Sequence, residues 1–180
     1  GVLGTNNLTW KEHIEQMTKK ANKQLWLIIR TLGFDAPTKA KRIAYITMVR
    51  SILDYASEIW NPTNKEQIIA IEKIQRVATN WILKNPHRTR PGYQDYKQRL
   101  IDCNLLPLTY RREIQDIIQI CKTLHNKSSI NLTTKINFPD RTVGPRTRFL
   151  TKQNHLMVPK TTRRTNTEFF PNRVAKIWNT

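Results

Sequence analysis

The chain has 180 residues, 38% of them hydrophobic, which is enough for one domain with an extension. Lys and Arg total 31 against 13 Asp and Glu, a net charge of +18 that opposes compaction and favours a polyanionic partner. Nucleic acid is the first candidate and an anionic membrane surface the second; a merely solvated basic surface is the alternative. Two cysteines do not make a disulfide framework, and no apolar run approaches the ~20 residues of a membrane span.

Residues 9–32 are predicted to form the first helix. Thr9 and Glu12 match a capping box, and Gly33 follows as a stop signal. One face is apolar at helical spacing, with Trp10, Ile14, Met17, Ala21, Leu25, Ile28 and Leu32. The opposite face carries residues suited to nucleic acid: Lys19, Lys23, Trp26 and Arg30. Trp26 either stacks on a base or sugar or packs against a neighbouring helix.

The second predicted helix spans residues 37–60 and stops at Asn61-Pro62. Arg50 and Asp54, four residues apart on its narrow polar face, are expected to pair. Its apolar residues cover about half of the circumference, so we expect it to be buried between partners. They are Tyr45, Ile46, Met48, Val49, Ile52, Leu53, Tyr55, Ala56, Ile59 and Trp60.

The third helix is predicted to open with a capping box, Thr63 to Glu66, and to end before Pro86. Its apolar residues are Ile68, Ile71, Ile74, Ala78, Trp81 and Ile82. We expect the helices to pack through Trp60 and Trp81. Between Pro86 and Pro91 a basic loop carries Arg88 and Arg90, which either contact phosphates or are simply solvated.

A short helix over 93–103 and a long one over 109–126 complete the predicted bundle. The long helix carries an apolar stripe of Ile114, Ile117, Ile118, Cys121 and Leu124. Residues 9–126 are therefore predicted to be an all-α bundle of four or five helices.

Residues 127–180 are predicted to be a basic, loop-rich segment. They hold 11 Lys or Arg against Asp140 and Glu168, a net charge of +9, at more than twice the charge density of the preceding residues. Their densest cluster, which we expect to touch phosphates, is Arg141, Arg146, Arg148, Arg163 and Arg164. A short terminal element that docks is predicted from Phe169, Phe170, Val174, Ile177 and Trp178.

The sequence lacks the patterns of common catalytic sites. No paired aspartates occur to hold the two Mg²⁺ ions of a polymerase, and no phosphate-binding glycine loop is present. Cys121 and His125 have the spacing of two metal ligands on a helix, which Cys103 and one of His13, His87 or His155 would complete. These spacings match no zinc-finger pattern, and core packing is the alternative that we expect. We therefore predict no metal or cofactor in this chain.

Five motifs, in this order, resemble the region that follows the palm in non-LTR (LINE-type) retrotransposon reverse transcriptases. The first two are Gly1-Val2 with Leu8, Trp10, His13 and Ile14, and then Tyr45, Val49, Leu53, Asp54, Tyr55, Ala56, Ile59 and Trp60. The third and fourth are Glu72 to Ala78, and Leu106-Pro107-Leu108 with Arg111 and Arg112. The last is Phe169, Phe170, Asn172, Arg173, Trp178 and Asn179. Ser51 stands where many relatives have proline, so the helix here is expected to run unbroken, and Gly4-Thr5 weakens the strand expected there.

The resemblance implies a thumb in residues 9–126, a post-thumb segment in 127–180, and the remnant of a primer-grip turn in 1–8. It implies that the catalytic aspartates and their Mg²⁺ lie in a palm upstream of Gly1, so this chain should not polymerise alone. By the same resemblance it would act in the nucleus, holding RNA template, RNA–DNA duplex and target DNA beside its own palm and fingers. A domesticated or standalone nucleic-acid-binding protein and a helical protein–protein module remain the alternatives.

Overall fold

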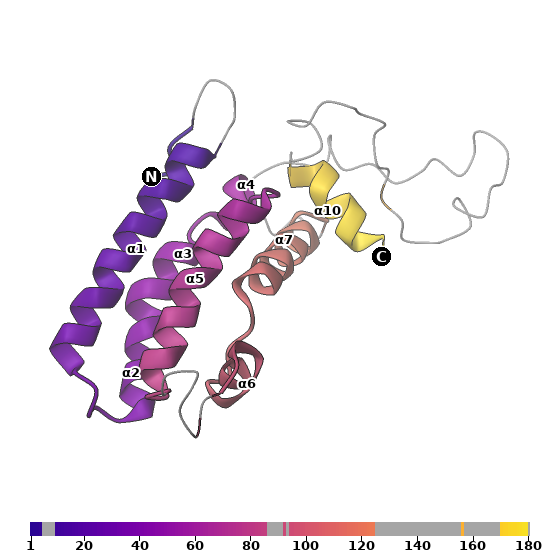
Figure 1. Cartoon of the computed structure of the whole chain (residues 1–180). Coiled ribbons are helices and arrows are strands. Elements are labelled where there is room, and N and C mark those ends of the chain that lie inside the picture. Colours follow the sequence, from indigo (N-terminus) through magenta and orange to yellow (C-terminus); the bar gives the residue numbers. More distant parts are fainter. Residues whose placement is uncertain (5–9, 86–91, 93, 125–155, 157–169, 180) are drawn as a thin grey trace, which may run out of the picture. The chain divides into compact units, whose positions relative to one another are not determined.

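The computed structural model describes residues 1–4, 10–85, 92, 94–124, 156 and 170–179, and all regular structure among them is helical (Figure 1). The elements are α1 (Lys11–Leu32), α2 (Thr38–Ala44), the π-helical turn η1 (Tyr45–Arg50), α3 (Ser51–Asp54), α4 (Ser57–Trp60), α5 (Lys65–Ile82), α6 (Tyr96–Asp102), α7 (Leu108–Leu124) and α10 (Phe170–Trp178). The predicted all-α fold is confirmed. The chain divides into two compact units, Gly1–Arg111 and Arg112–Thr180.

The core of the first unit forms where α1 packs along α5 and η1. The apolar faces predicted for the first and third helices lie in it. Their buried residues include Ile14, Met17, Ala21, Leu25 and Ile28 on α1, and Ile71, Ile74, Ala78, Trp81 and Ile82 on α5. Trp60 is also fully buried, so both tryptophans expected to pack the bundle do so. Because each large apolar side chain contributes roughly 1.5–3 kcal/mol on burial, this packing fixes which face of α1 points inward.

The second predicted helix is interrupted near its end, where the sequence predicted one unbroken helix to Trp60. It continues from α2 through η1 and across Ser51, as expected, but Tyr55 is extended and Ala56 adopts a left-handed conformation with φ of 52°. Such a residue costs roughly 1 kcal/mol or more. The break lets the Trp60 Nε1 donate to the Tyr55 carbonyl at 2.8 Å while the indole is fully buried, which offsets that cost.

The π-helical turn also changes which side chains of this segment are buried. A π turn holds more residues than an α turn. Side chains that follow it therefore point in a different direction from the one that α-helical spacing predicts. Tyr45, Val49 and Leu53 are buried. Met48, Tyr55 and Ile59 are 45%, 61% and 54% exposed, so the prediction that the whole apolar arc is buried was wrong for them.

The helix starts differ from the predicted capping boxes. The α5 N-cap is Asn64, whose Oδ1 accepts a hydrogen bond from the Glu66 backbone N–H at 2.9 Å, so the box predicted at Thr63 was wrong by one residue. Asp95 caps α6 in the same way, and this helix begins at Tyr96, later than predicted. The N-cap of α1 is Trp10, which makes no side-chain cap hydrogen bond, so the box predicted at Thr9 was also wrong by one residue; Thr9 itself lies outside the described residues.

A buried polar network joins η1, α5, α6 and the start of α7. The Tyr45 hydroxyl donates to Gln75 Oε1 at 2.8 Å, and Gln75 Nε2 donates to the Tyr96 hydroxyl at 3.2 Å. Tyr96 donates to Glu72, whose Oε2 accepts from the Leu108 backbone N–H at 3.1 Å. Burial raises the pKa of both Tyr45 and Tyr96, which keeps both phenols protonated as donors. The network satisfies polar groups that would be costly if buried unpaired.

Within the second unit, α10 confirms the short terminal element predicted from its aromatic residues. Arg173 binds Asp116 of α7 through two hydrogen bonds of 3.0 Å each. An apolar cluster beside this pair consists of Ile120, Leu156, Val174 and Ala175. The Asn179 side chain both donates to and accepts from the Leu156 backbone at 2.9 Å.

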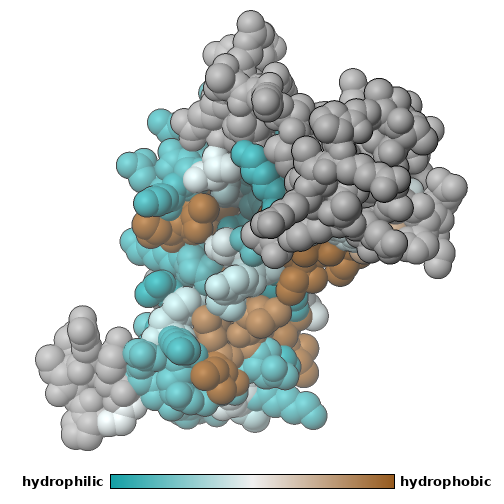
Figure 2. All heavy atoms as spheres, turned by 90° about the vertical axis from the view of Figure 1, so that its right-hand side faces the viewer, coloured by the Kyte–Doolittle hydropathy of each residue, from teal (hydrophilic) through white to brown (hydrophobic). Residues whose placement is uncertain are grey.

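The apolar stripe predicted on the long helix is partly exposed. Ile114 and Ile118 are 43% and 47% exposed, whereas Arg112 and Asp116 on the other side of α7 are fully buried. The Arg173–Asp116 pair explains part of this reversal, since it draws the polar side of α7 inward. Figure 2 shows that hydrophobic residues (brown) also reach the surface elsewhere among the described residues.

The buried network predicts a specific loss of stability. Tyr45→Phe removes the hydroxyl that Gln75 Oε1 accepts from, so we expect the free energy of unfolding to fall by about 1–2 kcal/mol. Urea denaturation followed by far-UV circular dichroism measures this. The matched control is Tyr55→Phe, whose ring is largely exposed and which should change stability by less than about 0.5 kcal/mol. Equal losses in the two variants would contradict the role given to the network.

Candidate nucleic-acid interface

The four residues predicted on the polar side of α1 form one exposed stripe. Lys19, Lys23, Trp26 and Arg30 follow one another at intervals of four, three and four residues, which places them within roughly 60° of arc on a helix. All four are exposed, and the opposite face of α1 is buried in the core. We call these four residues the basic stripe. Because the opposite face of α1 packs in the core, the basic stripe lies on a rigid helix.

The charge along this side of α1 changes sign. On this side Glu12 and Glu15 are exposed in the first turns and the cations follow from Lys19, whereas the exposed Lys11 lies off the stripe. Lys20 adds a further exposed cation next to the stripe. Lysine and arginine side chains that point away from a core gain affinity for phosphates by releasing condensed counterions. The half of α1 toward its C-terminus is therefore the part suited to a polyanion.

Trp26 belongs to the surface, with 57% of its area exposed. It lines an open pocket of about 440 Å³ between the end of α1, the turn that follows it and the end of α5. The other lining residues are Ile29, Phe34, Asp35, Val77, Asn80, Trp81, Lys84 and Asn85. We call this the aromatic pocket.

The aromatic pocket contains residues that sequence reasoning missed. Phe34 is 60% exposed in the turn after Gly33, whose φ of 65° favours glycine. Lys84 follows the end of α5 and lies 3.4 Å from Asp35, an exposed pair that contributes little to stability. The available signals were an aromatic residue directly after a helix stop, Phe34 after Gly33, and a cation two residues before Pro86, Lys84.

The ends of the predicted basic loop are fixed beside this pocket. Asn85, a pocket residue, donates to the Gln94 carbonyl at 3.0 Å and accepts from the Gln94 backbone N–H at 2.9 Å. Arg88 and Arg90 lie between these two residues in sequence and outside the described residues. The same holds for the whole predicted tail cluster, Arg141, Arg146, Arg148, Arg163 and Arg164. The structure thus brings together the four residues of the basic stripe and leaves the other seven predicted contacts untested.

Two further cations of the first unit serve the fold. The Lys41 ammonium is fully buried and donates to the carbonyls of Phe34 at 2.9 Å and Trp81 at 3.2 Å. Burial, followed by the nearby Lys84 charge, lowers its pKa. Arg42 donates to the carbonyls of Cys103 at 2.5 Å and Asn104 at 3.2 Å, at the end of α6. Cations at helix C-termini stabilise the last carbonyls, so these two hold helix ends in place.

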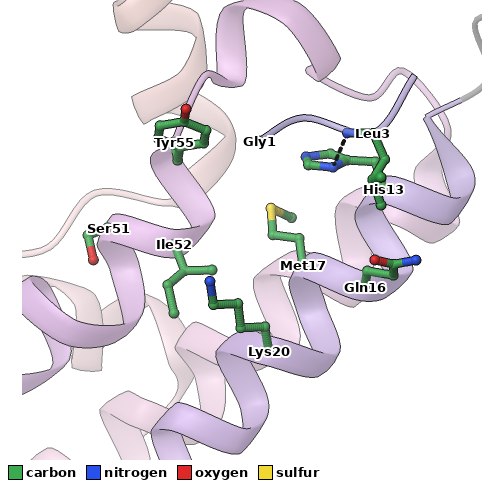
Figure 3. Close-up of a pocket in the computed structure, with 9 residues that line it drawn as sticks. All are labelled: Gly1, Leu3, His13, Gln16, Met17, Lys20, Ser51, Ile52 and Tyr55. Atoms are coloured by element: carbon green, nitrogen blue, oxygen red, sulfur yellow. Dashed lines mark hydrogen bonds between the residues drawn. The ribbon is translucent and has the colours of Figure 1, made fainter.

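A second open pocket, of about 630 Å³, lies between the N-terminal residues, α1 and α3 (Figure 3). His13 lines it, and its Nδ1 accepts a hydrogen bond from the Leu3 backbone N–H at 3.3 Å. The imidazole also contacts Trp60, with ring centroids 5.6 Å apart, and its Nε2 is buried without a hydrogen-bond partner among the described residues. Burial, and then the N-terminal amino charge, lower the pKa of His13, which favours the neutral ring.

The residues that the structure describes contain neither a candidate metal site nor a membrane-spanning helix. No group of three or more His, Cys, Asp or Glu side chains there could hold a metal ion. Cys103 is buried, and burial raises the pKa of its thiol to about 11. His125 lies outside the described ranges, so the Cys121–His125 alternative is not tested. None of the described helices is both long and apolar enough to cross a bilayer.

Comparison with known proteins finds a similar protein whose function is not characterized. No family model matches it, and no solved structure matches it. The chain is 25% identical over 133 residues to the uncharacterized protein B0403.1 of Caenorhabditis elegans. The match covers 74% of this chain and 61% of that protein. Because that protein is uncharacterized, the similarity indicates no activity for this chain.

The environment of His13 predicts a pH-dependent stability. Its lowered pKa means that the folded chain binds the proton less readily than the unfolded chain, whose histidine titrates near 6.5. The stabilising effect of a neutral His13 is therefore present above about pH 6.5 and is lost as the pH falls below it. We expect urea denaturation to show a smaller free energy of unfolding at about pH 5 than at about pH 7.5.

His13→Gln, which keeps a polar side chain but cannot titrate, is the test of that assignment. The stability difference between the two pH values should shrink in this variant. If the difference is unchanged, another group causes it.

Proposed function

We propose that this chain is the template–primer-gripping part of the RNA-directed DNA polymerase of a non-LTR retrotransposon, without the catalytic palm. The observation that carries the proposal is the basic stripe, in which two lysines, one arginine and one tryptophan stand exposed on one side of a helix whose other side is core. The net charge of +18 and the order of the five motifs support it.

In this proposal the stripe holds the sugar–phosphate backbone of an RNA–DNA duplex without reading its sequence. Lys19, Lys23 and Arg30 neutralise phosphates, and the counterions that they release supply the affinity. Contacts of this kind position the protein on a duplex and carry no base specificity. This suits a polymerase part that must move along any template.

The positions of the motif residues support a shared scaffold. Glu72 and Gln75 hold the buried network, and Asp54 accepts from Arg111 at 2.8 Å. Arg173 and Asn179 make the polar contacts of α10. A family related through residues of this kind would share a fold, while its nucleic-acid contacts would come from surface cations between the motifs.

The proposal assigns the chemistry of polymerisation to a palm outside this chain. The carboxylates and Mg²⁺ of that palm transfer the nucleotide, and this chain keeps the duplex in register with them. Alone, it binds and does not polymerise. RNA template, RNA–DNA duplex and target DNA are its partners in this proposal, and the nucleus is its place of action.

A helical protein–protein module is the second candidate, favoured by the apolar side of α7. Tyr110, Ile114 and Ile118 are 60%, 43% and 47% exposed at intervals of four residues. Such a stripe suits a partner protein, the palm of the same polymerase included. A chain that binds a protein partner but no duplex would fit this candidate.

The grip is tested by comparing two triple variants with equal loss of charge. Lys19→Gln/Lys23→Gln/Arg30→Gln removes the cations of the stripe, and Lys39→Gln/Lys65→Gln/Lys97→Gln removes three exposed cations elsewhere. Fluorescence anisotropy with a blunt RNA–DNA duplex gives the dissociation constant at several salt concentrations. Each lost phosphate contact reduces the salt slope by about 0.9, so the stripe variant should lose roughly 2–3 from its slope.

The control variant should keep most of the slope and bind close to the unaltered chain. If both variants lose the same amount, the affinity reflects net charge and the stripe is not the grip. If the unaltered chain binds no better at low salt than at high salt, the electrostatic grip itself is wrong.

A further inference from the structure

The aromatic pocket lies at the end of the basic stripe and shares Trp26 with it. Trp26 comes from α1, Phe34 from the turn after α1, and Trp81 from the last turn of α5. Two of the three aromatic rings are more than half exposed, at 57% for Trp26 and 60% for Phe34. Exposed aromatic faces around a hollow beside cations are the usual means of holding nucleic-acid bases.

The floor of the pocket is held in place. Trp81 is 3% exposed, and its Nε1 donates to the Gly33 carbonyl at 2.9 Å. The Lys41 ammonium lies 5.5 Å from the centre of the Trp81 ring, a cation–π contact. Gly33, which precedes Phe34, is thus tied to α5, and the Lys41 ammonium links the Phe34 carbonyl to that of Trp81, which makes the pocket a preformed one. A volume of about 440 Å³ lies within the usual range for small-molecule pockets.

The charges around the pocket favour an anionic ligand. Lys84 lines it, and Arg30 lies one turn beyond Trp26 on α1. Asp35 is the acidic residue among those lining the pocket, and its carboxylate is 3.4 Å from the Lys84 ammonium. A ligand with a flat apolar ring and a phosphate matches both parts of this surface. Basic and neutral peptides match the aromatic part alone.

We infer that the aromatic pocket binds an unpaired base of a nucleic acid whose duplex lies on the basic stripe. A base inside a duplex has both faces stacked on its neighbours, so it cannot offer one to Trp26 or Phe34. An unpaired base can stack on these rings while its phosphate contacts Lys84 or Arg30. The chain would then prefer the junction between duplex and single strand, and this preference rests on the proposed function of the stripe.

The experiment compares two probes at one salt concentration. One is a blunt RNA–DNA duplex, and the other is the same duplex with a short unpaired extension. Because stacking on an aromatic side chain strengthens binding by roughly tenfold per base, we expect the extended probe to bind about tenfold more tightly. Trp26→Leu and Phe34→Leu keep an apolar side chain and remove the ring, so each should reduce this preference.

Two further variants separate stacking from general packing. Trp26→Phe retains a ring and should keep most of the preference for the extended probe. Leu27→Ala removes an apolar residue that is 52% exposed at the next position of α1, and it should leave the preference unchanged. Phe34→Leu, at a position outside the basic stripe, should bind the blunt duplex within about twofold of the unaltered chain, because it removes no phosphate contact.

Three outcomes would overturn the inference. In the first, the unaltered chain would bind both probes with equal affinity. In the second, Trp26→Leu would lower the affinity for both probes by the same factor. In the third, Leu27→Ala would remove the preference for the extended probe as Trp26→Leu does. A failure of the proposed function looks different, since then neither probe binds in a salt-dependent way. Salt-dependent binding without preference for the extension leaves the grip intact and rejects the pocket as a base site.

Discussion

The packing of α1 against α5 is the interaction on which the surface of this protein depends. One side of α1, from Ile14 to Ile28, is removed from water, and a straight helix must then present its other side to the solvent. In this chain that other side carries Lys19, Lys23 and Arg30. Any change that rotated α1 would bury cations and expose the core, at a cost of several kcal/mol. The position of the basic stripe is therefore fixed by apolar packing.

The cations of the chain divide into two groups by their surroundings. Lys41, Arg42 and Arg173 are occupied by carbonyls or a carboxylate, and they hold helix ends and elements together. The cations of the basic stripe are exposed, so they can contact the phosphates of a bound partner. A net charge alone could not distinguish these groups. The first group contributes to the fold, and the second remains at the surface.

Local periodicity predicted the features that depend on one helix at a time. The basic stripe and the core face of α1 follow from spacing, because α1 is a regular helix. The break at Ala56, the π turn over 45–50 and the partly exposed Ile114 depend on contacts between segments distant in sequence. The burial of Trp60, whose ring contacts His13 of α1, accompanies the first, and the Arg173–Asp116 pair contributes to the last. Phe34 was missed as a candidate because its exposure depends on a turn whose geometry only the folded chain defines.

The central claim is that polyanions bind on the exposed side of α1, and lysine reactivity tests it most directly. The chain is acetylated briefly, alone and with an excess of RNA–DNA duplex, and each lysine is quantified by mass spectrometry. The duplex should protect Lys19 and Lys23, while Lys39, Lys65 and Lys97 stay as reactive as before. Lys41, being buried, should react poorly in both samples and reports that the fold is intact. Protection spread evenly over all exposed lysines, or confined to those outside α1, would contradict the account.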